Sequence, residues 1–306
     1  MTKCHSLDDP KNNWAYCPSL PAAVVFAVLF AGTSIMHIYQ AHKYRNNYAW
    51  TVIMGAIWET ASFTIRSIST QHPTTEALYD PHFLLFLIAP LWINAFVYML
   101  LGRMVYFFLA DQRLFKIRAQ RMTLTFVALD IVSFLVQILG GVMTISKNRT
   151  ILQRGLNIYT AGVAMQEFFI FCFIFLVIAF QRRLNREEAN RVRITQAKRL
   201  VLAMYLALAL ISVRIFFRII EFSAGVGTKL TTEVRDKEVY QYVFDALLMF
   251  FALVIFNVLH PGKILAGDDS KFQKKSKTQK QDEKQQRKQE RAERKALRSN
   301  EAEWTA

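Results

Sequence analysis

Ionisable residues lie inside long apolar runs of this sequence, where a charge is costly unless it meets another polar group. The run ISVRIFFRIIEF, residues 211–222, carries Arg214, Arg218 and Glu221 among large apolar side chains. At about 100° per residue, these three side chains fall on one face of a helix. Because a charge near a bilayer centre costs at least about 2.5–3.5 kcal/mol, we expect this face to meet an interior polar site.

Other polar side chains interrupt apolar runs in the same way, and together they make the candidate site. The candidates for substrate binding or translocation are Glu59, Arg66, Asn94, Asp130, Gln137, Glu167, Arg214, Arg218, Glu221 and Asp245. We expect them to form a polar seam, widest in the outer half, that accommodates a lipid head group, an amphipathic cation or a proton. The alternative is a buried salt-bridge network that only fixes the register of the helices.

The elements that must position these residues are membrane-spanning helices. The composition is 53% hydrophobic with 25 Phe, and a helix needs roughly 20 apolar residues to cross a bilayer. Seven stretches qualify, at about 20–40, 50–68, 82–109, 122–145, 155–180, 200–222 and 239–259. The runs are apolar almost all round, unlike the alternating strands of a barrel. We therefore predict an all-α integral membrane bundle of seven transmembrane helices.

The distribution of Lys and Arg predicts the orientation of the bundle. The first, third and fifth connectors and the C-terminal tail hold 26 of these residues, whereas the N-terminal segment and the other connectors hold 8. Because basic segments are retained in the cytosol, residues 1–19 should be extracellular and residues 260–306 cytosolic. The tail is expected to be disordered or a solvated helix. Its cations should attract anionic lipids of the inner leaflet.

Further features concern the extracellular side of the protein and the kinds of catalytic motif that the sequence lacks. Cys4 and Cys17 could form a disulfide, Asn148 begins the only glycosylation sequon, and the aromatic rings of Trp14 and Tyr16 are typical of a membrane-interface belt. The chain has no HExxH, CxxC, phosphate-binding glycine loop or GxSxG motif. We expect no cofactor, no metal site, no nucleic-acid partner and no enzymatic activity.

Several segments together resemble the fungal lipid-translocating exporters, the RTA-like seven-helix proteins. They are YCPSLPAAVVFAVLF, IAPLWINAFVYMLLGRM, LDIVSFLVQILGGVM, VRIFFRIIEFSAGVGTKLTTEV and YVFDALLMFFALVIFNVLHPG. The resemblance implies a plasma-membrane protein that moves or releases sphingoid long-chain bases and confers resistance to toxic amphiphiles. Some members of the family resemble porphyrin transporters. Glu59 and Arg66 stand in WETASFTIR, a less glycine-rich setting than the family usually has.

Two classes of function follow from these observations. In a transporter, an amphipathic lipid or drug-like substrate lays its chain among the Phe-rich helices while its amino group meets Glu59, Glu167, Glu221 or Asp245. In a receptor or sensor of membrane-lipid stress, a ligand in the outer cluster alters what the cytosolic side binds. An intramembrane enzyme ranks third, because isolated carboxylates without metal-ligating His residues give no plausible site. The transporter is the prediction, with membrane lipids as its partners.

Overall fold

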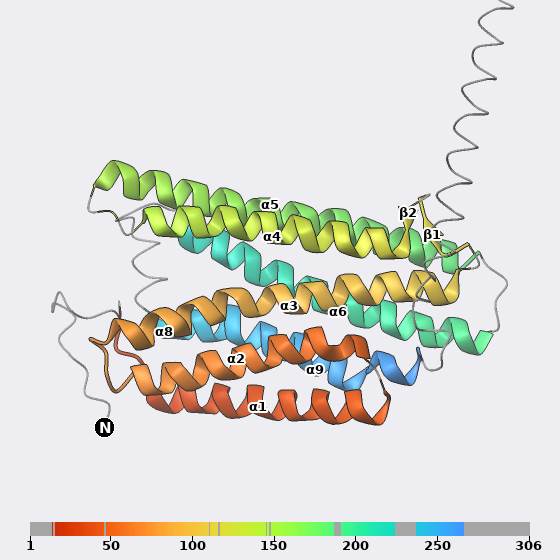
Figure 1. The fold of residues 1–306 in the computed structure, drawn as a ribbon, viewed down its shortest axis with the longest axis horizontal. Coiled ribbons are helices and arrows are strands. Elements are labelled where there is room, and N and C mark those ends of the chain that lie inside the picture. Colours follow the sequence, from red (N-terminus) through yellow and green to blue (C-terminus); the bar gives the residue numbers. More distant parts are fainter. Residues whose placement is uncertain are drawn as a thin grey trace, which may run out of the picture. The chain divides into compact units, whose positions relative to one another are not determined.

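The described structure is a bundle of long helices (Figure 1). The computed structural model describes residues 14, 16–45, 47–109, 111–115, 117–144, 146, 148–186, 191–223 and 237–265. The long helices are α1 (Leu20–Lys43), α2 (Trp50–Ser69), α3 (Glu76–Phe108), α4 (Ala119–Met143), α5 (Arg149–Leu184) and α6 (Arg191–Ser223). A last helix is built from α8 (Glu238–Gln241), the π-helical turn η2 (Tyr242–Ala246) and α9 (Leu247–Val258). The predicted all-helical class is confirmed.

Short elements complete the described chain. Two 3₁₀ turns, η1 (Asn47–Ala49) and η3 (Pro261–Lys263), precede α2 and follow α9. A small antiparallel hairpin of β1 (Arg113–Leu114) and β2 (Ile117–Arg118) joins α3 to α4. The hairpin was not predicted, because two-residue strands are too short to produce a periodic pattern.

Six of the long helices are apolar and long enough to cross a bilayer, and α2 is not among them. Its Glu59 and Arg66 are buried, and they lower the hydropathy of a helix that still has 20 residues. A helix of that length spans about 30 Å, the thickness of a hydrocarbon core. The seventh crossing and the orientation of the termini therefore stay predictions.

Neighbours in the sequence are neighbours in the bundle. Contacts join each helix from α1 to α6 to the next, α6 to α9, and α9 back to α1, so the helices close into a ring. Figure 1 shows α4 and α5 side by side at one edge of this ring and α1 at the opposite edge. α3 also contacts α5 and α6. Polar residues that face inward on α2, α3, α4, α5, α6 and η2 are thereby brought toward one another.

The α4–α5 contact depends on glycine. A Cβ added at Gly140 would lie 2.3 Å from the backbone nitrogen of Tyr159, and one at Gly162 would lie 2.8 Å from Cγ of Gln137. Small residues allow helix backbones to approach closely in a membrane, where interhelical packing replaces the hydrophobic effect. This close packing places Gln137 of α4 against α5.

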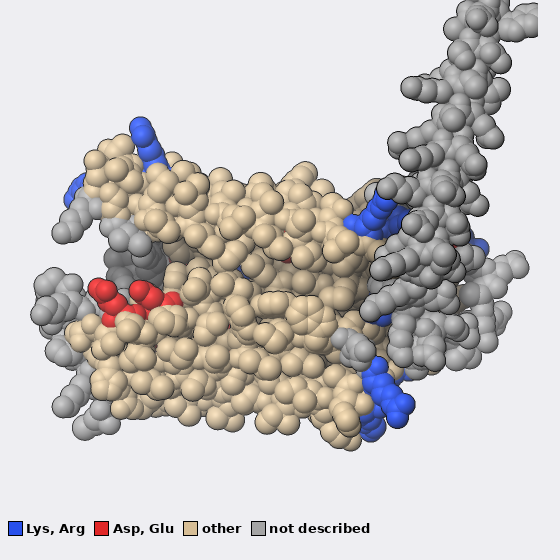
Figure 2. All heavy atoms as spheres, viewed as in Figure 1, with Lys and Arg blue, Asp and Glu red and all other residues tan. Residues whose placement is uncertain are grey.

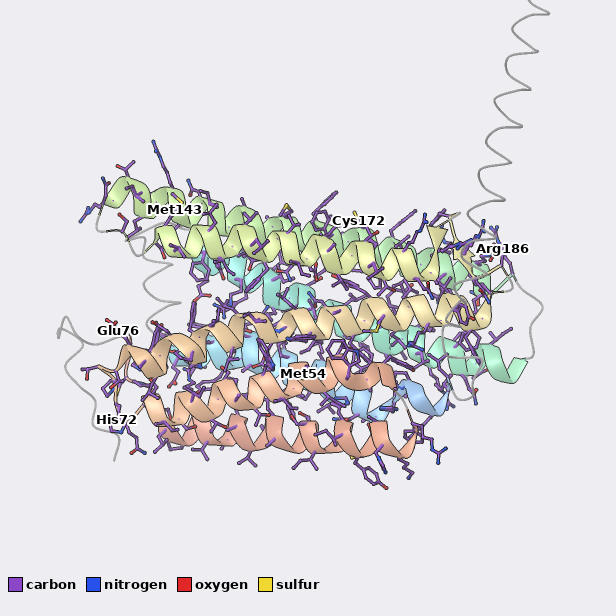
Figure 3. The ribbon with its side chains drawn as sticks, viewed as in Figure 1. Met54, His72, Glu76, Met143, Cys172 and Arg186 are labelled. Atoms are coloured by element: carbon purple, nitrogen blue, oxygen red, sulfur yellow. The ribbon has the colours of Figure 1, made fainter. Side chains whose placement is uncertain are left out.

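The outer surface of the bundle is apolar and its charges gather at the two ends. Exposed side chains include Leu124 (70% exposed) and Phe168 (61% exposed), while Arg66 and Asp245 are buried. On the face drawn in Figure 2, the surface between the charged ends is almost entirely free of Lys, Arg, Asp and Glu. Glu76 and Arg186 mark opposite ends of the bundle in Figure 3. We call the end where α3 begins the outer end and the end where α3 finishes the inner end, following the predicted orientation.

Candidate functional site

A buried ion cluster connects α6 to the π-helical turn of the last helix. Oδ1 of Asp245 accepts a hydrogen bond from Nε of Arg214 at 2.5 Å, and Oδ2 forms an ion pair with Nη2 of Arg218. Nη1 of Arg218 also pairs with Glu221 at 3.1 Å. Asp245 has no exposed surface, and the two guanidinium groups are almost completely buried. We call these four residues the ion cluster.

Local structure explains how these side chains meet. Arg214 and Arg218 are four residues apart and Glu221 follows three residues later, so the stripe predicted on residues 211–222 faces the bundle interior. Asp245 lies within η2, a π-helical turn in which the backbone hydrogen bonds span five residues instead of four. Such π-helical turns occur frequently at functional sites, because the extra residue redirects a side chain. Here the turn presents Asp245 to α6.

Glu59 of α2 lies near the ion cluster without joining it. Its side chain has no exposed surface, and neither carboxylate oxygen has a hydrogen-bond partner within the described part of the chain. The charges that act on it are those of Asp245, Arg214 and Arg218. An uncompensated buried carboxylate costs several kcal/mol. The Glu59 side chain therefore either carries a proton or binds a cationic partner.

Arg66 belongs to a different set of contacts at the outer end, which we call the Arg66 network. Its Nε donates to Tyr242 at 3.1 Å, and Nη1 donates to Nε2 of His82 at 3.3 Å and to Gln241 at 3.0 Å. Nη2 donates to Tyr16 at 2.8 Å and pairs with Glu238 at 2.9 Å. A guanidinium group has five N–H donors, and all of them are used here.

The aromatic rings of Trp14 and Tyr16 cover this network. Trp14 is 5% exposed, stacks on His82 and lies 4.9 Å from the Arg66 guanidinium. Tyr16 donates a 2.6 Å hydrogen bond to Gln241. Trp14 and Tyr16, which we expected in an interface belt, contact His82, Arg66 and Gln241, and their position in a membrane interface stays a prediction. Burial raises the pKa of the Tyr16 phenol from 10.0 to about 12, so it remains a donor at neutral pH.

Two further polar contacts lie deeper in the bundle. Oδ2 of Asp130 accepts hydrogen bonds from Asn94 at 3.1 Å and from Tyr98 at 2.9 Å. Gln137 of α4 donates to Gln166 of α5 at 3.0 Å. These pairs are interhelical, and each side chain is almost fully buried. Glu167, next to Gln166, lies beside Ser212 of α6.

Two hollows border the ion cluster. The first, the outer cavity, has a volume of ≈190 Å³ and is lined by Trp14, Tyr16, Arg66, Tyr79, His82, Phe83, Thr144, Phe217, Arg218, Glu221, Phe222, Lys237 and Gln241. The second, the inner void, has a volume of ≈10 Å³, about the space of one water molecule, and is lined in part by Gln137, Gln166, Arg214 and Arg218. Arg218 lines both hollows, so its side chain borders the outer cavity as well as the inner void.

The predicted candidates therefore divide into groups. The structure brings together Arg214, Arg218, Glu221 and Asp245, with Glu59 nearby. Arg66 makes no ion pair with that set, because Glu238 and the phenols of Tyr16 and Tyr242 occupy its donors, although it lines the outer cavity together with Arg218 and Glu221. The proposed role of all these residues in translocation stays a prediction.

Sequence reasoning missed the neutral partners of the charged residues. These are His82, Tyr98, Gln166 as a partner of Gln137, Gln241 and Tyr242, together with the acid Glu238. A Tyr or His in an apolar run produces no distinctive pattern. Glu238 was assigned to a connector, although it is the first residue of the last helix.

Two further predicted sites are the glycosylation sequon at Asn148 and the disulfide between Cys4 and Cys17. Asn148 is exposed and caps α5 by accepting a hydrogen bond from the Thr150 amide at 2.9 Å. Its glycosylation stays a prediction. Cys4 lies outside the described residues, so the Cys4–Cys17 bridge also stays a prediction.

The site described so far defines a class of protein. A ring of long apolar helices with an interior ion cluster beneath a cavity at one end belongs to polytopic membrane proteins that handle polar groups within the bilayer. The chain matches the RTA1-like protein family over residues 52–268, and it belongs to that family. It is therefore an integral membrane protein, and the family resemblance seen in the sequence is confirmed.

Individual relatives give the comparison more detail. The chain is 38% identical over 275 residues to the probable lipid transporter atnI of Emericella nidulans, covering 87% of this chain and 71% of that one. It is 30% identical to protein RTA1 of Saccharomyces cerevisiae, over 81% of this chain and 84% of the relative. Protoporphyrin uptake protein 1 of the same yeast is 28% identical, with 79% and 90% covered. No solved structure matches the chain.

Proposed function

We propose that this protein moves amphipathic lipids, such as sphingoid long-chain bases, across or out of the plasma membrane without hydrolysing nucleotide. Two relatives support this proposal, being named a probable lipid transporter and a lipid-translocating exporter-like protein. In this proposal all seven helices cross the bilayer, with the N-terminus outside. Resistance to toxic amphiphiles would follow from their removal.

The observation that carries the proposal is that Arg218 of the ion cluster lines both the outer cavity and the inner void. Glu221 lines the outer cavity with a side chain that is 16% exposed, so it can meet the amino group of a lipid there. Phe217 and Phe222 also line the cavity. Their rings attract a cation through their faces and pack against the first methylene groups of its chain.

Passage of a head group beyond this point requires Arg218 to leave Asp245 and Glu221. A cationic head group can replace the guanidinium group at these carboxylates, so the charge of the site is conserved during the exchange. Glu59 and Asp130 offer further carboxylates in the interior of the bundle. The movement would be driven by a concentration gradient or by the membrane potential, or it would be passive scrambling.

Reconstitution tests the proposal. Purified protein in liposomes should accelerate the flip of a fluorescent long-chain base above the rate of empty vesicles. Glu221→Gln should slow this flip by about tenfold, because it removes a charged partner worth on the order of 1.5 kcal/mol or more, but should leave the flip of a neutral ceramide unchanged. Glu76→Gln, an exposed acid at the same end of the bundle, is the matched control. A wild-type rate equal to that of empty vesicles would reject the proposal.

A second candidate function has a specific observation in its favour. Arg66, Arg218 and Lys237 also line the outer cavity, and cations there suit the carboxylates of a porphyrin. One relative is named a protoporphyrin uptake protein. Vesicle uptake of protoporphyrin that Lys237→Gln abolishes, without any flip of the long-chain base, would favour this function.

A receptor for lipid stress is the alternative from another class. It predicts no lipid flux in vesicles, together with a cytosolic protein that binds only when the lipid is present. Measuring flux and partner capture on the same purified preparation separates the two classes.

A further inference from the structure

We propose that a groove at the inner end of the bundle, formed by α5 and the β1–β2 hairpin, binds an anionic glycerophospholipid of the surrounding leaflet. The groove has a volume of ≈660 Å³, and its walls include Phe115, Phe175, Ile178 and three arginine side chains. It is separate from the ion cluster and the outer cavity, which share none of these residues. We call it the arginine groove.

The order of residues along α5 matches the order of groups in a phospholipid. Phe175, Ile178, Arg182 and Arg186 are spaced three, four and four residues apart, so they follow one face of the helix. This stripe is apolar in its first half and basic in its second half, and it covers about 16 Å of helix. A lipid lying along it would place an acyl chain on Phe175 and Ile178 and its phosphate at the arginines, near the inner end (Figure 3).

The hairpin supplies the opposite wall of the groove. The ring of Phe115 stacks on that of Phe175, with centroids 5.9 Å apart and an angle of 9° between the planes. Phe115 has φ of 48°, in the left-handed region, which is uncommon for a bulky residue. Both rings are more than half exposed, at 57% and 59%. The chain thus accepts backbone strain at the turn to hold an aromatic ring at the groove, as functional sites commonly do.

The three arginines have different tasks. Arg183 pairs with Asp111 at 2.9 Å and donates to the carbonyl oxygen of Arg113 at 2.9 Å, so it fastens the hairpin to α5. Arg182 and Arg186 are exposed and make no ion pair within the described ranges. Their guanidinium groups are therefore available to a phosphate, for which Arg has the matching fork of donors.

The groove combines apolar side chains with arginines, and this combination fits a lipid and not a soluble anion. A soluble phosphate would leave the stacked rings and Ile178 without a partner, whereas an acyl chain covers them. Anionic head groups are concentrated in the cytoplasmic leaflet, which the inner end faces in the proposed orientation. Because the groove lies within residues 114–186, this site is distinct from the basic tail and leaves the tail's expected attraction to lipid untouched.

The test compares two arginine pairs on the same helix. Full-length protein is placed in nanodiscs of phosphatidylcholine containing a trace of fluorescent phosphatidylserine, and energy transfer from the protein to that lipid is titrated. Arg182→Gln with Arg186→Gln should weaken phosphatidylserine enrichment on the order of tenfold. Arg149→Gln with Arg154→Gln, which makes the same charge change at the other end of α5, should have no effect. Phe175→Ser should also weaken enrichment, because it removes one apolar wall.

The outcomes decide between the possible sources of binding. Equal enrichment in wild type and in the Arg182/Arg186 variant would overturn the proposal and leave the basic tail as the lipid contact. Displacement of the lipid by inorganic phosphate at equal concentration would also overturn it, because an anion site would then suffice. All four arginine side chains are exposed, so both variants should fold, which size-exclusion profiles would verify.

Discussion

The two arginines that line the outer cavity are held in opposite ways. Arg66 has five hydrogen-bond partners, and they come from the N-terminal segment, α3 and the last helix. Among the described residues, Arg218 forms ion pairs with Asp245 and Glu221 alone, its guanidinium group lies 5.3 Å from the Phe86 ring, and it lines two hollows. A guanidinium group with every donor used fixes the structure around it. In the proposed function, a guanidinium group held by a carboxylate that lines an open cavity, as Glu221 does, exchanges it with another cation.

The Arg66 network and the ion cluster differ in how many neutral hydrogen-bond partners surround their arginines. Tyr16, Tyr242, His82 and Gln241 allow Arg66 to be buried with only one acid, Glu238, in direct contact. The ion cluster instead sets two arginines against two acids, with Glu59 unpartnered beside them. Breaking a pair in a cluster of this kind leaves a buried charge. The Arg66 network should therefore govern stability alone, and the ion cluster both stability and transport.

The largest effect is expected from Asp245→Asn. The substitution removes the carboxylate that Arg214 and Arg218 share, so Arg214 loses its ion pair and Arg218 keeps only the one with Glu221, which should lower the free energy of unfolding by about 3–5 kcal/mol. Denaturation in mixed detergent micelles would measure the loss. Asp80→Asn, at an exposed acid of α3, is the control. A change below about 1 kcal/mol would show that the cluster contributes little to folding.

Arg66→Lys should have an intermediate effect on stability and little effect on transport. Lysine keeps the charge but has three donors in place of five, so about 2 kcal/mol should be lost. Lipid flux per folded molecule should remain within about twofold of wild type, whereas Arg218→Lys should alter it several-fold. If Arg66→Lys abolished flux in folded protein, the contrast between the two arginines would be wrong.

Tyr16→Phe should have the smallest effect, about 1 kcal/mol, because Arg66 retains its other partners. Burial raises the pKa of Tyr16 from 10.0 to about 12, so the folded state holds the phenolic proton more tightly than the unfolded state. The stability that the phenol contributes should be complete below pH 10 and lost as the pH rises to about 12. Unfolding measured at pH 7, 10 and 11.5 in wild type and variant would check this, and an unchanged difference at pH 11.5 would contradict it.

The order of the helices and the interior position of the charged stripe could be predicted from the sequence. Long apolar runs specify helices in a bilayer because all backbone groups must be satisfied within them. The three charged residues of α6 share a face by spacing alone. The partners of Arg66 could not be predicted, because they depend on where the last helix begins and on where Tyr16 lies relative to it.

The sequence by itself determined the all-helical class, the family and the requirement that the charges within the helices meet inside the bundle, since hydrocarbon penalises a lone charge wherever it lies. Only the tertiary structure decided which charges meet. Arg66 pairs with Glu238, Arg214 and Arg218 share Asp245, and Glu59 is left without a hydrogen-bond partner among the described residues. The reason is that the pairing depends on helix order, on helix rotation and on one π-helical turn, which place specific atoms within 3 Å and leave no periodic trace in the chain.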